Sequence, residues 1–310
     1  MNAESEAARM EKVAVSTTSF CEYDQTPFKM LDQKGLKYLV NSTGRKLNKY
    51  ELVELAKDAI GLIAGTETID RNVISQLPNL KVISRCGAGM DNVDLAAAQK
   101  NGIKVYNTPD APTLAVAELT VGIMLDMLRN ISHVDRQIRA GQWKKLMGNL
   151  ISEKKIGIIG YGRIGRKVAA LLKSFNCPIA YSDPAIKDDA AGDDRMALGD
   201  LLKWADIISI HVSSAEKIIG AGELDQMKEG SWIVNVSRGG VVDEEALFKN
   251  LKTGRLAGAA IDVYEREPYT GPFLDLDNIV LTPHVGSYAR ESRVEMEKQS
   301  VANLLKGLLP

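Results

Sequence analysis

The sequence predicts an α/β protein of two doubly wound domains, each built on a parallel sheet. The 310 residues exceed what one hydrophobic core usually organises, so two domains are the default expectation. Short apolar runs alternate with amphipathic stretches from end to end, which is typical of parallel strands joined by crossover helices. The alternation is interrupted by the two prolines within residues 107–112 and then starts again, which places a domain boundary there.

The first alternating series follows a polar, Glu-rich N-terminus, for which we expect a flexible tail over residues 1–11. Helix-like segments such as Lys49–Lys57 and Asn92–Asn101 separate its apolar runs. These runs are rich in Val, Ile and Leu and too short for helices, so they predict buried strands. The expected strands are Val13–Val15, Tyr38–Val40, Gly61–Ala64, Lys81–Ser84 and Ile103–Tyr106.

A long helix is predicted over Leu114–Ala140, ending at Gly141. Its apolar positions are too numerous for one buried face, so we expect burial on more than one side. One explanation is packing against a second subunit, and we therefore expect a homodimer through residues 114–140. The apolar positions are Val116, Leu119, Val121, Ile123, Met124, Leu125, Met127 and Leu128.

The second alternating series predicts six strands, the number of a dinucleotide-binding sheet. A last helix is expected over Ala289–Gly307. The six strands are expected at Ile156–Gly160, Ile179–Ser182, Ile207–His211, Trp232–Val236, Ala257–Asp262 and Ile279–Leu281.

A glycine-rich turn, Gly160-Tyr-Gly162-Arg163-Ile164-Gly165, lies between the first of these strands and a helix expected over Arg166–Phe175. This is the context that a dinucleotide-binding fingerprint requires, with the pyrophosphate on the helix N-terminus. Asp183 ends the next strand, and its carboxylate suits the ribose hydroxyls of NAD and would repel a 2′-phosphate. The alternative is a purely structural turn, with Asp183 as a turn former before Pro184.

Composition narrows the functional classes. Lys and Arg total 39 against 40 Asp and Glu, a balance that argues against nucleic acid as a partner. No apolar run is long enough to cross a bilayer, and the N-terminus has no apolar signal region. The three cysteines are widely spaced, which is typical of reduced thiols and favours a cytoplasmic protein. No Cys/His group has metal-ligand spacing, so we expect no metal.

Three further motifs in the second half each begin where a strand ends. They are Val236-Ser-Arg238-Gly-Gly, Asp262-Val-Tyr-Glu-Arg-Glu267-Pro, and Pro-His284-Val-Gly286-Ser. In an open α/β sheet, ligands bind beyond the carboxyl ends of the strands. These motifs are therefore expected to converge on one site. Taken singly, each has a structural alternative: Arg238 as a surface ion pair, His284 as a strand-end residue, and Glu267 as a turn residue before proline.

The chain resembles the D-isomer-specific 2-hydroxyacid dehydrogenases, the phosphoglycerate dehydrogenases among them most of all. Besides the motifs above, the resemblance includes Arg85-Cys-Gly87-Ala88-Gly89, Asn107-Thr-Pro109 and Val116-Ala-Glu118, and it covers nearly the whole chain. It implies a flavodoxin-like substrate-binding domain (12–107 and 288–310) and a Rossmann NAD-binding domain (108–287). It also implies NAD-dependent hydride transfer between a small 2-oxo acid and its D-2-hydroxy acid.

The resemblance further implies roles for individual residues. Arg238 would hold the substrate carboxylate and polarise the 2-oxo group. His284 would exchange the proton, with its pKa raised by Glu267. Substrate contacts are implied for Arg85, Gly87, Ala88 and Gly89, and cofactor contacts, besides the glycine-rich turn and Asp183, for His211, Val236, Asp262, His284 and Gly286.

The sequence departs from the family pattern at a few positions. Gly65-Thr66 stands where relatives often carry an arginine for a substrate phosphate, and Ala88 replaces a frequent threonine. Whether the substrate is phosphorylated stays open, and Arg85 could instead serve packing. Two other functions also stay open: an NAD-sensing, corepressor-like binding protein, and a phosphite dehydrogenase-like enzyme. Glu267 speaks against the formate dehydrogenases, which use glutamine there.

Overall fold

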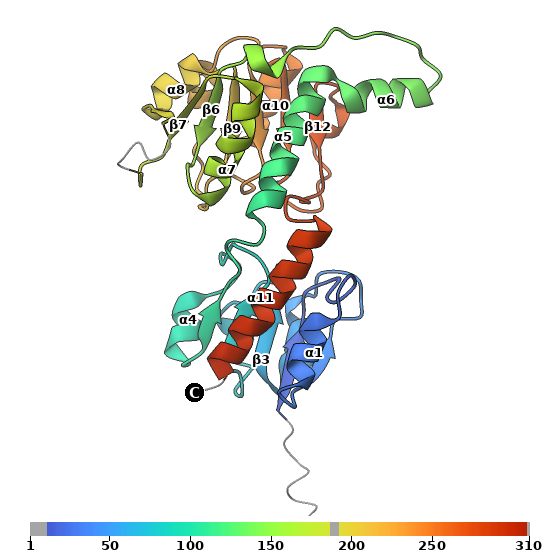
Figure 1. Cartoon of the computed structure of the whole chain (residues 1–310), viewed down its shortest axis with the longest axis vertical. Helices are drawn as coiled ribbons and strands as arrows, with labels where there is room; N and C mark the ends of the chain where they lie inside the picture. Colours follow the sequence, from blue (N-terminus) through green and yellow to red (C-terminus); the bar gives the residue numbers. More distant parts are fainter. Residues whose placement is uncertain (1–10, 187–191, 309–310) are drawn as a thin grey trace, which may run out of the picture. The chain divides into compact units, whose positions relative to one another are not determined.

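The computed structural model describes residues 11–186 and 192–308. These residues divide into two compact units (Figure 1). The first unit comprises the chain up to Pro112 and again from Ser287, and the second comprises Thr113–Gly286. Each unit has its own parallel sheet with helices on both faces, so the predicted fold class is confirmed.

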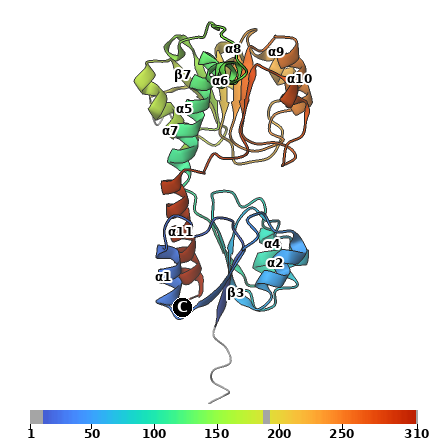
Figure 2. The ribbon, with the colours of Figure 1, turned by 90° about the vertical axis from the view of Figure 1, so that its right-hand side faces the viewer.

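The sheet of the first unit has the strand order β2-β1-β3-β4-β5, which is the flavodoxin-like order. Helices α1 and α11 lie on one face of it and α2 and α4 on the other (Figure 2). The strands are β1 (Lys12–Val15), β2 (Lys37–Val40), β3 (Ala59–Ala64), β4 (Val82–Arg85) and β5 (Lys104–Tyr106). The helices are α1 (Thr26–Asp32), α2 (Lys49–Ala56), α3 (Arg71–Ile74), α4 (Leu95–Lys100) and α11 (Arg290–Leu308).

The C-terminal helix α11 packs directly on this sheet, against β3, β4 and β5. Gly61 permits the close approach, because a Cβ there would lie 2.9 Å from Cδ1 of Leu304. Of the predicted tail, Glu11 is described, and its carbonyl accepts a hydrogen bond from the N–H of Lys37. Residues 1–10 lie outside the described residues.

The sheet of the second unit has the order β12-β11-β10-β9-β6-β7-β8. It contains seven strands, so the predicted number of six was wrong: the prediction omitted the edge strand β8. This strand has two residues, both exposed, and therefore leaves no apolar signal in the sequence. The strands are β6 (Ile156–Ile159), β7 (Ile179–Ser182), β8 (Asp194–Arg195), β9 (Ile207–Ile210), β10 (Trp232–Asn235), β11 (Gly258–Ile261) and β12 (Ile279–Leu281).

The predicted single helix over 114–140 is wrong. It is two helices, α5 (Thr113–Arg129) and α6 (Ile131–Arg139), separated by Asn130 in the left-handed conformation (φ +54°). Asparagine adopts this conformation more readily than most residues, which is why the chain turns there. The break is fixed by the N–H of Ser132, which donates to Oδ1 of Asp126 over 2.7 Å.

Helix α5 buries most of its apolar side chains inside its own unit, against α7, β11 and β12. The high apolar content of α5 is thus largely explained without a second subunit, whereas α6 buries none of its residues.

The remaining helices of the second unit are α7 (Arg163–Leu172), α8 (Leu198–Trp204), α9 (Ala221–Gln226) and α10 (Glu244–Lys252). Three 3-10 turns complete its described part: η1 (Ile151–Glu153), η2 (Lys173–Phe175) and η3 (Pro272–Asp275). No helix in the described ranges is long and apolar enough to cross a bilayer.

Candidate active site

Most of the predicted site residues lie at one edge of the sheet in the second unit. All its paired strands are parallel, so their carboxyl ends share this edge. Helices α5 and α7 cover one face of the sheet and α8, α9 and α10 cover the other. The edge carries Gly160 after β6, Asp183 after β7, His211 after β9, Val236 and Arg238 after β10, Asp262 after β11, and His284 after β12.

His284 and Glu267 form a hydrogen-bonded pair. The Nδ1 atom of His284 lies 3.0 Å from both Oε1 and Oε2 of Glu267. The hydrogen bond that Glu267 accepts from His284 raises the pKa of His284, against the opposing effects of burial and of the positive charge of Arg238. Because Nδ1 faces the carboxylate, Nε2 is the ring nitrogen that can exchange a proton with a substrate.

Asp262 holds the segment on both sides of His284. Its Oδ1 accepts hydrogen bonds from Oγ1 of Thr282 (2.6 Å) and the N–H of Val285 (2.8 Å), and its Oδ2 accepts one from the N–H of Gly286 (2.9 Å). Asp262 is fully buried, which raises its pKa. These bonds hold His284 in the left-handed conformation (φ +55°), which non-glycine residues rarely adopt. The contact of Asp262 with the cofactor stays a prediction.

The loop that carries Arg238 is built by Asn235, the last residue of β10. The side chain of Asn235 donates to the carbonyl of Arg238 (3.0 Å) and accepts from Oγ of Ser237 (2.8 Å). Nη1 of Arg238 donates to the carbonyl of Ser237. A Cβ at Gly239 would lie 1.9 Å from the carbonyl oxygen of Tyr264, so only glycine fits. The Arg238 loop therefore passes directly against the segment that leads to Glu267.

The glycine-rich loop has the form that a dinucleotide needs. Gly160 has a positive φ (+86°), and a Cβ there would lie 2.7 Å from the carbonyl oxygen of His211. A Cβ at Gly165 would lie 2.2 Å from the carbonyl oxygen of Gly160, whereas the space beside Gly162 is open. Gly162 is the N-cap of α7, whose first turn contains Arg163 and Ile164. A helix N-terminus beside open backbone fits a pyrophosphate.

Asp183 is fixed at the end of β7 by two backbone groups. Its Oδ2 accepts from the N–H of Tyr161 (2.7 Å), and its Oδ1 accepts from the N–H of Ala185 (2.8 Å). The bond to Tyr161 connects the carboxylate directly to the glycine-rich loop. An ionised carboxylate has about four acceptor positions, so acceptor capacity remains for ribose hydroxyls.

His211 and Val236 have mainly buried side chains. Nε2 of His211 lies 2.8 Å from Oγ of Ser209, and burial lowers the pKa of His211 to about 3, so the ring is neutral. Val236 belongs to the apolar cluster beneath α5 and α7. Their predicted contacts with the cofactor stay predictions, and the structure gives both residues a packing role.

The predicted substrate loop, Arg85–Gly89, belongs to the first unit and follows β4. Arg85 donates to the carbonyl of Cys86 and to Oδ1 of Asn92. The N–H of Gly87 donates to Oγ1 of Thr108 (2.8 Å) and is therefore used inside the loop. The substrate contacts predicted for Arg85, Gly87, Ala88 and Gly89 stay predictions.

Sequence reasoning missed the residues that hold the site in place. Asn235 and Thr282 each lie at or just after a strand end, and Tyr161 lies inside the glycine-rich turn. Polar residues at the ends of buried strands were the available signal, because they must pair with nearby loop backbone. Their partners lie up to 32 residues away in the chain, and only the folded structure shows which ones they are.

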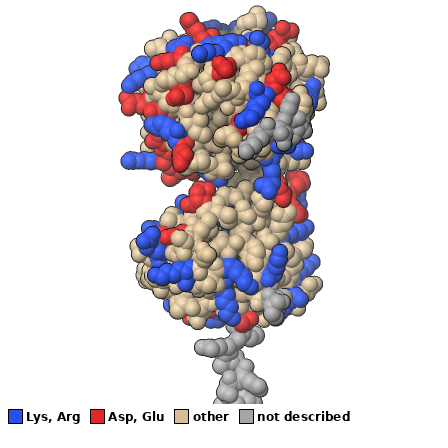
Figure 3. Space-filling view, turned by 90° about the vertical axis from the view of Figure 1, so that its left-hand side faces the viewer, with Lys and Arg blue, Asp and Glu red and all other residues tan. Residues whose placement is uncertain are grey.

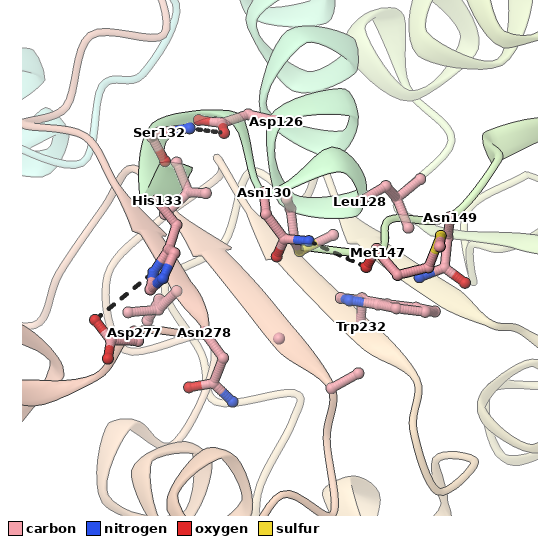
Figure 4. A pocket seen from close by; sticks show the side chains of 15 residues that line it. Asp126, Leu128, Asn130, Ser132, His133, Met147, Asn149, Trp232, Asp277 and Asn278 are labelled. Carbon is pink, nitrogen blue, oxygen red and sulfur yellow. Dashed lines mark hydrogen bonds and ion pairs between the residues drawn. The ribbon is translucent and has the colours of Figure 1, made fainter. Parts of the chain in front are cut away.

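A surface pocket of the second unit lies at the opposite, amino-end edge of the sheet. Figure 4 shows His133 facing Asp277, with Asn130, Met147 and Trp232 along the same wall. Trp232 begins β10 and Ile279 begins β12, so this pocket is separate from the predicted site. Within the described ranges, the His, Cys, Asp and Glu side chains form no group of three or more that could hold a metal ion.

The chain is similar to known proteins over most of its length. The family model for the D-isomer specific 2-hydroxyacid dehydrogenase NAD binding domain matches residues 121–286. A D-3-phosphoglycerate dehydrogenase of Archaeoglobus fulgidus is 37% identical over 277 residues, covering 85% of this chain and 51% of that protein. A hydroxypyruvate reductase of Thermotoga maritima is 36% identical over 293 residues, covering 90% of this chain and 96% of that protein.

Among solved structures, the TT0316 protein from Thermus thermophilus matches with a TM-score of 0.89 and 34% identity, covering 96% of both chains. The chain spans about half the length of the phosphoglycerate dehydrogenase and nearly the whole length of the hydroxypyruvate reductase.

Proposed function

The chain belongs to the D-isomer-specific 2-hydroxyacid dehydrogenases, and from this premise we propose that it transfers a hydride between NAD(H) and a small 2-oxo acid. The product of reduction is the D-2-hydroxy acid. The observation that carries the proposal is the pairing of His284 Nδ1 with the Glu267 carboxylate, because it leaves a proton-bearing Nε2 at the carboxyl edge of a dinucleotide-binding sheet.

When bound, the reduced nicotinamide supplies the hydride that C2 of the oxo acid takes up. His284 donates a proton from Nε2 to the carbonyl oxygen, so the C=O double bond becomes CH–OH. Glu267 favours the imidazolium before transfer and keeps the ring oriented. Arg238 binds the substrate carboxylate through its planar donors. In the oxidative direction, neutral His284 accepts the hydroxyl proton.

The cofactor assignment rests on this chain's own residues. The open backbone at Gly162, at the N-terminus of α7, receives the pyrophosphate, and Asp183 receives the ribose hydroxyls. We assign the nicotinamide amide to the Asp262 segment. The Arg85–Gly89 loop of the first unit is assigned to the substrate carboxylate on the strength of the resemblance, with Ala88 and Gly89 as the N–H donors.

The two named relatives act on acids that differ in charge, since one name specifies a phosphorylated acid and the other hydroxypyruvate. We propose a small 2-oxo acid and leave the phosphate to experiment. Gly65 and Thr66 carry no cation, and a Cβ at Gly65 would crowd Oε1 of Glu67 (2.9 Å) and Cα of Thr17 (3.0 Å). The lack of a cation at these two residues favours a substrate without phosphate.

A second copy of the chain is the partner that we propose. Helix α6 buries no residue, and large apolar side chains remain exposed on it and on the following segment: Ile131, Ile138, Trp143, Met147 and Leu150. Such a patch typically marks a protein interface.

Basic and acidic side chains are interspersed over the visible face of the second unit (Figure 3). No basic patch for nucleic acid is therefore seen on that face, and nucleic acid is not proposed as a partner. We propose a cytoplasmic location because all three cysteines are free and buried.

The experiment follows NADH absorbance with glyoxylate, pyruvate, hydroxypyruvate, branched and aromatic 2-oxo acids, and 3-phosphohydroxypyruvate. Phosphite with NAD is tested in parallel, and His284→Ala serves as the inactive control. Turnover of a 2-oxo acid that disappears in the control supports the proposal. Tight NADH binding without turnover would favour a sensor, and turnover of phosphite alone would favour phosphite oxidation.

A further inference from the structure

Tyr161 is bonded at both of its ends to carboxylates. Its backbone N–H donates to Asp183 over 2.7 Å, and its phenol hydroxyl donates to Oδ2 of Asp193. The residue is 1% exposed and belongs to the core beneath α5 and α7. Its side chain therefore lies away from any ligand, and an effect on a bound coenzyme has to pass through its backbone.

The ring of Tyr161 is held from two sides. It stacks on Tyr181 with ring centroids 3.9 Å apart and planes 13° apart. The guanidinium carbon of Arg166 lies 5.4 Å from the ring centroid, and Nε of Arg166 donates to the Tyr161 carbonyl. These contacts restrict the orientation of the Tyr161 ring, and the bond from Arg166 to the carbonyl also restrains the backbone of Tyr161.

Asp193 is the buried anchor of this arrangement. It is 5% exposed, and its Oδ1 lies 3.2 Å from Nζ of Lys173. Burying a carboxylate costs free energy unless its oxygens are paired. Asp193 therefore needs the hydrogen bond from the Tyr161 hydroxyl. Burial and the bond to Asp193 raise the pKa of Tyr161, which keeps the hydroxyl protonated as a donor.

The position of Asp193 in the sheet connects Tyr161 to the region around Asp183. Asp193 immediately precedes β8, the edge strand paired with β7, while Asp183 follows β7. The bond thus connects the glycine-rich loop after β6 with the sheet edge beyond β7. Asp183 lies at the end of the strand between them and accepts the Tyr161 N–H.

We propose that Tyr161, locked by Asp193 and Lys173, is a positioning residue for the adenosine ribose of the coenzyme. It holds the Asp183 carboxylate through its N–H, so that the remaining acceptor positions of Asp183 meet the ribose hydroxyls. This inference concerns coenzyme binding and does not depend on which 2-oxo acid the protein reduces.

The first test is Tyr161→Phe, which removes the hydroxyl and keeps the ring. A hydrogen bond to a charged group is stronger than one between neutral groups, and transmission of part of its energy predicts a roughly three- to tenfold higher Kd for NADH and for ADP-ribose. Both Kd values are measured by direct titration, by fluorescence and calorimetry. The Kd of reduced nicotinamide mononucleotide, which lacks the adenosine half, is expected to stay unchanged.

Tyr38→Phe is the matched control, because Tyr38 likewise stacks on another aromatic ring, that of Phe28, but belongs to the first unit. A Kd for ADP-ribose in Tyr161→Phe equal to that in the control would overturn the proposal. An equal loss for reduced nicotinamide mononucleotide would also overturn it, because general loosening of the unit affects both halves of the site.

A second pair of variants keeps the test valid if Tyr161→Phe does not fold. Asp193→Asn weakens the anchor while retaining its shape, and Asp194→Asn alters the neighbouring exposed carboxylate. We expect Asp193→Asn to raise the Kd of ADP-ribose about two- to threefold, as expected for partial loss of a charged bond, and Asp194→Asn to leave it unchanged. Equal values for these two variants would contradict the proposal. Because ADP-ribose binding is measured without turnover, failure here is distinguishable from failure of the proposed reaction.

Discussion

Nδ1 of His284 lies 3.0 Å from each carboxylate oxygen of Glu267, and this relationship determines which ring nitrogen is left for chemistry. The carboxylate stabilises the imidazolium and so raises the pKa of His284. His284 therefore keeps its proton, the one needed to reduce a carbonyl, to a higher pH than an isolated histidine does. The same pairing fixes the ring orientation from one side, while Asp262 fixes the backbone from the other.

Glu267→Gln is expected to shift the pH profile of reduction. Reduction requires protonated His284, so kcat/KM is constant at low pH and falls as pH rises through the pKa of His284, which Glu267 raises. Without the carboxylate, the falling limb moves to lower pH, towards the ordinary histidine value of about 6.5. The pH dependence of kcat/KM measures this, with Glu265→Gln as the control. An unshifted limb would show that another group sets the profile.

Arg238→Gln is expected to lower kcat/KM for the 2-oxo acid by roughly 10²–10³, the cost of removing one preorganised donor to a developing negative charge. NADH affinity should change little, because the assigned role concerns the substrate. Steady-state kinetics and NADH titration separate the two effects. Arg266→Gln, which alters another arginine of the second unit, should keep wild-type values. If Arg238→Gln keeps kcat/KM and loses NADH binding instead, the assignment to the substrate is wrong.

His211 should make the protein less stable in acid. Its folded pKa of about 3 lies below its unfolded value of about 6.5, so as pH falls between these values the unfolded chain takes up a proton that the folded protein does not. Stability attributable to this group is therefore complete above pH 6.5 and is lost towards pH 3. In His211→Asn, urea unfolding at pH 7 and pH 4.5 should show a pH-dependent loss smaller by about 2 kcal/mol. Equal losses in variant and wild type would argue against a buried neutral His211.

The exposed apolar patch on α6 and the following segment predicts a dimer. Sedimentation equilibrium should give twice the chain mass of 33.8 kDa, and Ile138→Asp should reduce it to a single chain. Placing a charge in an apolar interface without a partner costs several kcal/mol, which is enough to dissociate most dimers. Tyr50→Asp, at an exposed aromatic of the first unit, is the control. A wild-type monomer, or an Ile138→Asp dimer, contradicts the proposed interface.

The strands that carry the site were predictable because each is a short apolar run between turn signals, as at Ile156–Ile159 and Ile207–Ile210. The strand β8 was not predictable, because both of its residues are exposed and leave no apolar run. It is a strand only because it pairs with the neighbouring strand β7. The break at Asn130 was missed because apolar spacing continues across it, and a left-handed residue leaves no mark on helical periodicity.

The proposed reacting residues Arg238, Glu267 and His284 come from motifs at strand ends, where the topology of a parallel sheet brings such motifs to one edge. Their supports could not be identified in the same way. That Asp262 holds Val285 and Gly286, or that Tyr161 reaches Asp193, depends on hydrogen bonds between loops that only the fold brings together.

The central claim is tested most directly with NADH deuterated at the transferable position of nicotinamide C4, using the 2-oxo acid that the panel identifies. The account predicts a D-2-hydroxy acid with one deuterium at C2 and a hydroxyl proton from solvent, formed by the wild type and absent with His284→Ala. An L product, a product without deuterium at C2, or undiminished turnover in His284→Ala would contradict it.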